Sequence, residues 1–402
     1  MNTAKRARQR GFTLVELLVA TTAGLIVSAA AFLLARNSAA VFQEETRITA
    51  AQMSASLGLQ RLASDIGRAG FLSTPNITTD PFVCNESGTW PPLLANLRAV
   101  RIGDAGSVVA HGPDLADSTA NGFAPDDITI ASSVDNSEEF PIRTIQPGGV
   151  GKVVFLETNN SQVKRTCREA PLATCLPKFQ AIFKPDRIIR IVTPEGNQIF
   201  GLSNGVSLTG DQLVLGLQTT PVVPAVGANP KGYRADCWDC KVNAIAVVRY
   251  ELQSLKGHPT YGPLVAPLAA AGTGDDRRTE LTRVELDPQG LPIANTLELV
   301  AEFAVDLKFG ISFIAPGNNG MTDIPAPLPA NPLIYTTPPE TLRSVNIRFS
   351  TRARAPDRVS DIAGGPDGRR YRFKLGIATN PSYARLRTLY TQVALQNLVK
   401  YW

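Results

Sequence analysis

The chain has 402 residues, of which 44% are hydrophobic and 19% are charged. This length holds one large domain or two to three ordinary ones, and the apolar content excludes disorder as the dominant state. Only one stretch is apolar enough to span a bilayer, which excludes a polytopic membrane protein. The chain has two histidines, which leave little room for His-based catalysis or a His-rich metal centre. The composition therefore favours a protein that is not an enzyme.

Most of the net charge of +5 comes from the N-terminus, where four basic residues precede Gly11 without an acidic partner. The remaining chain has 36 basic and 35 acidic residues, which removes the main support for charge-driven binding to nucleic acid. A second basic concentration lies between residues 343 and 387, where eleven basic residues accompany three aspartates. We favour a solvated face of strands and loops there. The alternative is a surface for an anionic partner, with the candidate residues Arg348, Arg352, Arg354, Arg369, Arg370 and Arg372.

The N-terminal segment combines a basic leader, Gly11-Phe12, Glu16 and nineteen uncharged residues from Leu17 to Ala35. As a helix the uncharged part is about 28 Å long, close to the thickness of the bilayer core. A secretory signal peptide or a plain signal anchor accounts for the basic flank but not for Glu16, because a carboxylate is costly in lipid. If the chain is cut after Gly11, the amine of a neighbouring Phe12 can pair with Glu16 and set the register between subunits.

This arrangement resembles the class III signal of type IV prepilins and type II secretion pseudopilins. The resemblance implies that a membrane-bound prepilin peptidase cuts after Gly11 and methylates Phe12, and that Glu16 is the assembly residue. It divides the N-terminus into a leader, residues 1–11, and a transmembrane or fibre-core helix half, residues 12–35. No proline precedes Pro75, so Gly24 is the obvious weak point of the apolar helix.

Residues 36–72 are expected to continue the helix to about Ala69 as an amphipathic half. Apolar residues recur there at steps of three and four, which places one stripe against a globular head: Ile48, Ala51, Ala55, Leu59, Leu62, Ile66 and Ala69. Gly70 is expected to end the helix. The segment Leu59–Phe71 is similar to the helix end of PilW-like minor pilins, in which an acidic-Ile pair precedes an Ala-Gly-aromatic triplet.

Residues 73–402 are expected to form a β-rich periplasmic or extracellular head. Strand-like runs cover residues 127–131, 152–156, 242–252, 303–311 and 342–350, whereas residues 313–340, rich in proline, predict an irregular, partly extended loop. Residues 390–397 resemble the closing strand of PilW-like and J-type pseudopilin heads. The predicted fold is α+β and pilin-like, with a long N-terminal helix packed on an antiparallel sheet and an enlarged head.

The five cysteines allow fifteen arrangements of two disulfides. Proximity favours Cys167 with Cys175 and Cys237 with Cys240, which leaves Cys84 over. A zinc site is not favoured, because there is one Cys-x-x-Cys and neither histidine is near. A thioredoxin-like role for Cys237 and Cys240 is also not favoured, because no βαβ pattern surrounds them.

Three further motifs have ordinary interpretations. Gly201–Gly205 has the spacing of a nucleophile elbow, but we expect a hairpin with an Asn-Gly turn. Gly148–Lys152 lacks two residues of a phosphate loop and is expected to be a turn into a strand. Asp275-Asp276 and the aspartates of residues 361–367 lack a calcium-loop pattern.

These features predict a minor pilin that primes or caps a type IV pilus at low copy. The expected partners are other minor pilins, the major pilin and prepilin peptidase, with a tip adhesin as an additional candidate. The expected location is the inner membrane, with one span and a periplasmic head, and then the extracellular pilus; no cofactor or metal is expected. The alternatives are a J-type pseudopilin of type II secretion, against which the length argues, and a DNA-uptake pilus component that uses the Arg-rich stretch.

Overall fold

The computed structural model describes residues 12–84, 90–103, 115–133, 137–148, 151–168, 170–234, 236–237, 239–265, 278–314, 320–326, 339–354, 372–375 and 382–398. The chain divides into two compact units, residues 1–50 and 51–402. We call the second unit the head.

The first helix, α1, spans Leu14–Gly67 and contributes residues to both units. Within the head its apolar residues Ala55, Leu59, Leu62 and Ile66 are buried on one face, as the three- and four-residue spacing predicts. The helix ends two residues before the expected Ala69. Gly70 follows in the left-handed conformation with φ of 75°, and a Cβ there would lie 2.5 Å from a methyl carbon of Leu398.

A first sheet of five antiparallel strands lies next to α1 in the head core. Its order is β1-β2-β8-β9-β10, where the long strand β8 contributes residues 246–253. The strands are β1 Val100–Gly103, β2 Asp127–Ser132, β8 Lys241–Gln253, β9 Glu280–Glu285 and β10 Glu298–Ala301.

The N-terminal end of β8 belongs to a closed barrel. In the sequence, the other strands of this barrel lie between β2 and β8. Residues 241–245 of β8 pair with β5 and residues 241–242 pair also with β3, and the ring closes in the order β8-β3-β4-β7-β6-β5. All six neighbouring pairs are antiparallel. The remaining barrel strands are β3 Phe140–Pro147, β4 Lys152–Leu156, β5 Ile188–Val192, β6 Gln198–Thr209 and β7 Gln212–Leu217.

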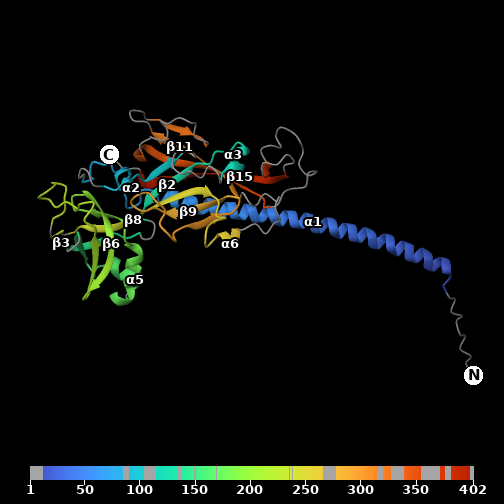
Figure 1. Cartoon of the computed structure of the whole chain (residues 1–402), viewed down its shortest axis with the longest axis horizontal. Helices are drawn as coiled ribbons and strands as arrows, with labels where there is room; N and C mark the ends of the chain where they lie inside the picture. The colour runs from blue at the N-terminus through green and yellow to red at the C-terminus, as the bar shows by residue number, and fades with distance from the viewer. Residues whose placement is uncertain are drawn as a thin grey trace, which may run out of the picture. The chain divides into compact units, whose positions relative to one another are not determined.

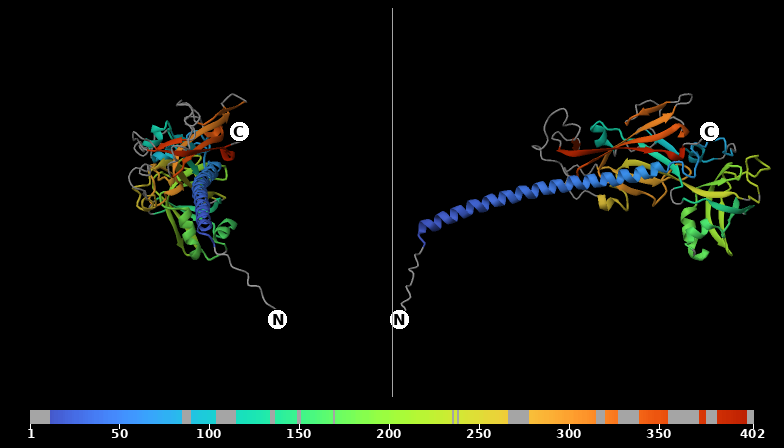
Figure 2. Two further views of the ribbon diagram at one scale, coloured as in Figure 1. Left: turned by 90° about the vertical axis from the view of Figure 1, so that its right-hand side faces the viewer. Right: turned by 180° about the vertical axis from the view of Figure 1, so that it is seen from behind.

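The barrel has its own apolar core and two short helices. The helices α4, Ser161–Cys167, and α5, Leu172–Ile182, connect β4 to β5. Phe140 packs against Phe179 and Phe183 at ring-centroid distances of 5.2 and 5.7 Å. In Figures 1 and 2 the green barrel strands gather beside α5, apart from the orange and red strands near the C-terminus.

A second five-stranded antiparallel sheet covers the core from the other side of α1. Its order is β12-β11-β13-β15-β14. Alternate residues of its central strands, such as Leu307 and Phe309 in β11 and Ile347 and Phe349 in β13, share one core with α1 and the first sheet. The strands are β11 Ala304–Ile314, β12 Met321–Ile324, β13 Leu342–Arg352, β14 Arg372–Leu375 and β15 Ser382–Ala394.

The short elements α2 Pro92–Ala95, α3 Ala116–Ala120 and α6 Gly262–Val265 and the 3-10 turns Pro339–Thr341 and Gln396–Leu398 complete the described head. The architecture is a long N-terminal apolar helix with a large antiparallel β-rich body, which confirms the α+β class. The five expected strand runs all lie within or overlap β2, β4, β8, β11 and β13.

One local expectation is wrong, and one segment expected to be partly extended contains a short strand. Asn204 and Gly205 lie inside β6 rather than in a hairpin turn, because the ladder absorbs an irregularity between Ser203 and Val206, where Gly205 has a φ of 95°. The hairpin turn instead lies between β6 and β7. The proline-rich segment 313–340 also contains a strand, β12, which pairs with the end of β11.

Candidate processing and assembly segment

The start of α1 is closed by a reciprocal capping interaction between Thr13 and Glu16. Glu16 Oε2 accepts hydrogen bonds from the Thr13 amide and from Thr13 Oγ1, both at 3.0 Å, and the Glu16 amide donates to Thr13 Oγ1 at 3.3 Å. Since α1 begins at Leu14, Thr13 occupies the N-cap and Glu16 the third helical position. This interaction is the capping box. Its Thr-x-x-Glu signature is present in the sequence and could have predicted it.

The apolar part of α1 is long enough to cross a bilayer. Residues Leu14–Ala39 have a mean hydropathy of 2.3, and none of them is buried. These 26 residues extend over about 39 Å as a helix, against about 30 Å of hydrocarbon. Thr21 and Thr22 donate their hydroxyls to the Leu18 carbonyl at 3.0 Å, so neither leaves an unsatisfied donor in an apolar setting.

The expected processing site lies just before this helix. Phe12 precedes α1 and its side chain is 88% exposed, whereas Gly11 lies outside the described residues. Glu16 is exposed, so its carboxylate is accessible to a further partner in addition to Thr13. The helix continues through Gly24 without a break.

A buried ionic cluster, which the sequence did not indicate, joins the part of α1 that lies in the head to the strands of the first sheet. Asp65 is 2% exposed and accepts hydrogen bonds from Tyr250 Oη at 2.7 Å and from Arg283 Nε at 2.9 Å. Burial, and next the Asp65 carboxylate, raise the pKa of the Tyr250 phenol, so the hydroxyl stays protonated and donates. Arg283 also contacts Glu298 in β10 at 3.3 Å. This Asp65 cluster therefore connects α1 with β8, β9 and β10.

Two candidates for the anionic-partner surface of the Arg-rich stretch, Arg348 and Arg352, are engaged within the head. Arg352 is 2% exposed, donates to the Ala353 carbonyl and lies 5.0 Å from the centre of the Phe303 ring. Arg348 forms an ion pair with Asp306 at 2.9 Å. Both therefore contribute to packing and internal pairing rather than to an open cationic face.

Of the remaining candidates of that stretch, the structure describes Arg354 and Arg372. The Arg372 guanidinium lies 5.7 Å from the centre of the Tyr383 ring, and Arg354 is exposed. Arg369 and Arg370 lie outside the described residues.

The cysteines form two local disulfides in the structure. Cys167 is bonded to Cys175 and Cys237 to Cys240, the pairs that proximity favoured. Cys84 is buried and belongs to neither bridge. Both bridges and Cys84 lie in the barrel core.

The metal and nucleophile motifs weighed in the sequence are not assembled in the part of the chain that the structure describes. Among these residues no group of three His, Cys, Asp or Glu side chains is placed to hold a metal ion. Ser203, the serine of the nucleophile-elbow spacing, is buried and donates to the Phe183 carbonyl at 3.0 Å. The acidic pairs at residues 275–276 and 361–367 lie outside the described residues.

The comparison with protein families supplies one finding. Residues 6–32 match the prokaryotic N-terminal methylation motif. No curated protein and no solved structure matches the chain. The motif implies processing by prepilin peptidase and assembly with other pilins, and the apolar helix fits membrane anchoring followed by incorporation into a pilus. The motif and this helix together support a type IV pilin-like protein, either a pilin or a pseudopilin.

Proposed function

We propose that the chain is a PilW-like minor pilin that assembles with other minor pilins to prime or cap a type IV pilus at low copy. The observation that carries the proposal is the methylation motif in front of an apolar helix that carries Glu16 at its start. In this proposal the protein has a structural rather than a catalytic role.

The chemistry of Glu16 explains how subunits would find their register. A charged side chain in the bilayer core costs roughly 3 kcal/mol on insertion scales, so a partner charge is strongly favoured. Thr13 supplies hydrogen bonds but no positive charge. The free amine of Phe12 on a neighbouring subunit would supply that charge, and its place beside Glu16 would fix the axial offset of two helices.

The size of the head supports a low-copy position. A compact unit of about 350 residues has a radius of gyration of about 20 Å and is roughly 50 Å across. Packed helices lie only about 8–10 Å apart. If every subunit carried such a head, the heads would need much more space than the helix spacing of the fibre core provides. We therefore place the subunit at an end of the fibre, where one head meets few neighbours.

The proposed topology follows from the leader and the cysteines. The basic residues before Gly11 would stay on the cytoplasmic side, which puts the head in the periplasm before assembly. The two disulfides of the barrel are compatible with that oxidising compartment. A tip adhesin resting on the head remains a candidate partner.

Two alternatives are less well supported. A J-type pseudopilin would share the same N-terminal signal, but a head of this size is larger than expected for it. Uptake of DNA through the Arg-rich stretch loses support because Arg348 and Arg352 are engaged within the head.

The first test is mass spectrometry of the protein recovered from its native membrane. We expect a chain that begins at N-methylated Phe12, and a Gly11→Ala variant that keeps residues 1–11. A wild-type chain that still begins at Met1 in cells that contain the peptidase would contradict the proposal.

The second test separates the charge of Glu16 from its capping role. Glu16→Gln keeps the capping box, because glutamine also fits its third position, but removes the charge. Thr13→Ala removes the capping hydroxyl and keeps the charge. We expect Glu16→Gln to lose incorporation into sheared pili, whereas Thr13→Ala and the control Glu45→Gln on the same helix retain it. Normal incorporation of Glu16→Gln would refute the charge-pairing account.

A further inference from the structure

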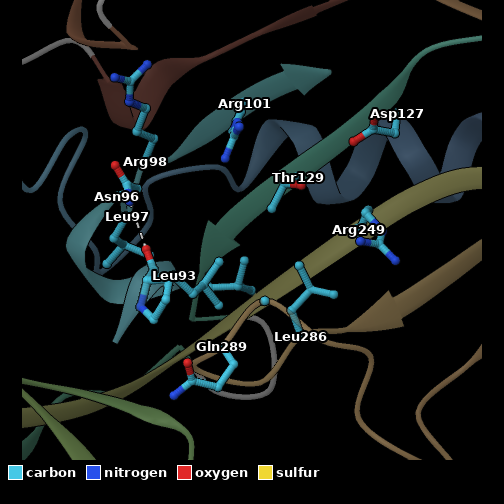
Figure 3. A pocket seen from close by; sticks show the side chains of 13 residues that line it. Leu93, Asn96, Leu97, Arg98, Arg101, Asp127, Thr129, Arg249, Leu286 and Gln289 are labelled. Atoms are coloured by element: carbon cyan, nitrogen blue, oxygen red, sulfur yellow. Dashed lines mark hydrogen bonds between the residues drawn. The ribbon is translucent and has the colours of Figure 1, made fainter. Parts of the chain in front are cut away.

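A cavity of about 260 Å³ lies on the face of the first sheet that points away from α1. Neighbouring strands place Arg101 of β1, Thr129 of β2 and Arg249 of β8 in one row across this face, since Arg101 pairs with Thr129 and Thr129 with Arg249. All three line the cavity, as Figure 3 shows. Thr129, which carries a hydroxyl, therefore lies between the two arginines of the row.

The opposite walls of the cavity carry apolar side chains beside the polar Asn96 and Gln289 (Figure 3). Leu93 and Leu97 come from α2 and the residues after it, and Leu286 follows β9. The amide of Leu93 donates to the Pro288 carbonyl at 3.0 Å, which ties α2 to the turn after β9. The cavity thus offers an apolar wall opposite polar strand residues, the usual composition of a binding pocket.

The charge of the lining is positive. Arg98, Arg101 and Arg249 line the cavity together with one carboxylate, that of Asp127. Arg249 is buried and lies 3.0 Å from Glu251 of the same strand. Within the described part of the chain, Arg98 and Arg101 form no ion pair, unlike Arg348 of the Arg-rich stretch. Arg101 acts on the nearby Asp127 carboxylate, but the lining keeps a net positive charge that favours an incoming anion.

The volume limits what can enter. Pockets for drug-sized ligands measure roughly 300–1,000 Å³, so this smaller cavity suits a side chain or two of a polypeptide. Arginine recognises carboxylates by planar, two-pronged hydrogen bonding. We propose that the cavity docks an acidic side chain, with an adjoining apolar side chain against Leu93 and Leu286, from an acidic segment of a partner protein. The proposal does not rest on the pilus function, because it concerns the pocket alone.

The affinity of this pocket also depends on pH. Burial raises the pKa of Asp127 to about 6, and it outweighs the opposing charges of Arg249 and Arg101, while Glu251 adds to the rise. Because Glu251 neutralises Arg249, ionised Asp127 above pH 6 leaves the lining with a charge of about +1, and its protonation below pH 6 brings this to about +2. An acidic ligand with a carboxyl pKa near 4.3 stays ionised through this range and binds more tightly as Asp127 is protonated.

The test is titration calorimetry on the full chain in detergent micelles with the blocked peptide acetyl-Leu-Glu-Leu-amide. Matched probes are the Gln and Lys versions of the peptide and acetyl-glutamate alone. We expect the Glu peptide to bind at least about tenfold more tightly than the Gln peptide, as for a hydrogen bond to a charged group, and to bind more tightly at pH 5.5 than at pH 7.5.

The variants locate the binding. Arg101→Glu should weaken the Glu peptide at least about tenfold and strengthen the Lys peptide, whereas Arg143→Glu, an exposed change of equal charge on β3, should change neither. Thermal melting of each variant establishes that it is folded. Equal binding of the Glu and Gln peptides, or binding of the Glu peptide that is unchanged by Arg101→Glu, overturns the proposal that this pocket docks an acidic side chain. Acetyl-glutamate that binds as tightly as the peptide overturns the polypeptide occupant in favour of a small anion.

Discussion

The Asp65 cluster gives a sharp prediction about how α1 is held in the head. In Asp65→Ala the buried guanidinium of Arg283 loses its buried carboxylate partner at 2.9 Å and keeps only the half-exposed Glu298 at 3.3 Å, and the Tyr250 hydroxyl loses its acceptor at 2.7 Å. Breaking a buried ion pair by removing one partner costs about 3–5 kcal/mol. Unfolding entropy near 2.1 cal/mol/K per residue, for a head of about 350 residues, converts 4 kcal/mol into a fall in Tm of about 5 °C.

The assay is thermal unfolding of the full chain, followed by circular dichroism in one detergent at pH 7.5. Tyr250→Phe removes one hydrogen bond to a charged acceptor and should cost about 1.5–3 kcal/mol. The double variant should cost clearly less than the two single changes together, because both remove the same contact. Asp236→Ala, which removes an exposed carboxylate, is the control and should leave Tm within about 1 °C. Additive effects, or an Asp65→Ala variant as stable as the control, would refute the reasoning.

Three further changes test the head. Asp127→Asn should stabilise the head at pH 7.5 by about 2–3 kcal/mol and have no effect at pH 4, as measured by urea unfolding at both pH values. The reason is that burial raises the pKa of this carboxyl to about 6, so its ionisation destabilises the fold as the pH rises from 3.9 through 6. Gly58→Val should lower stability by about 1–3 kcal/mol in the same urea assay, since a Cβ at Gly58 would lie 2.7 Å from that of Ala301; unchanged stability would contradict this close packing. Replacing Cys167 and Cys175 by alanine should cost about 2.5 kcal/mol from loop entropy, and reductant should then lower Tm less than in the wild type.

The helix was the most predictable part of the molecule, because its signals are local. Uncharged residues in an unbroken run, followed by apolar residues at helical spacing, specify α1 from Leu14 almost to its end. The strands were predictable for the same reason, since alternation and β-branched residues are properties of short segments. The Asn204-Gly205 turn failed because a bulge and a turn use the same residue types, and only the pairing partner distinguishes them.

The closed barrel could not be predicted, because its closure depends on strand pairs far apart in sequence. Phe140 pairs with Val242, and Ile188 pairs with Ile245. Nothing in either segment alone names the other. The same limit hid the Asp65 cluster, in which one helical carboxylate meets residues 185 and 218 positions later.

The sequence by itself determined the processing signal, the span and the long helix, because each depends on residue order over a few turns. Tertiary structure alone decided what the charged residues do. Arg352 and Arg101 are equally basic in sequence, yet folding buries the first beside Phe303 and leaves the second at the edge of a pocket. The physical reason is that the cost of burying a charge and the gain from pairing it depend on neighbours that only the folded chain brings together.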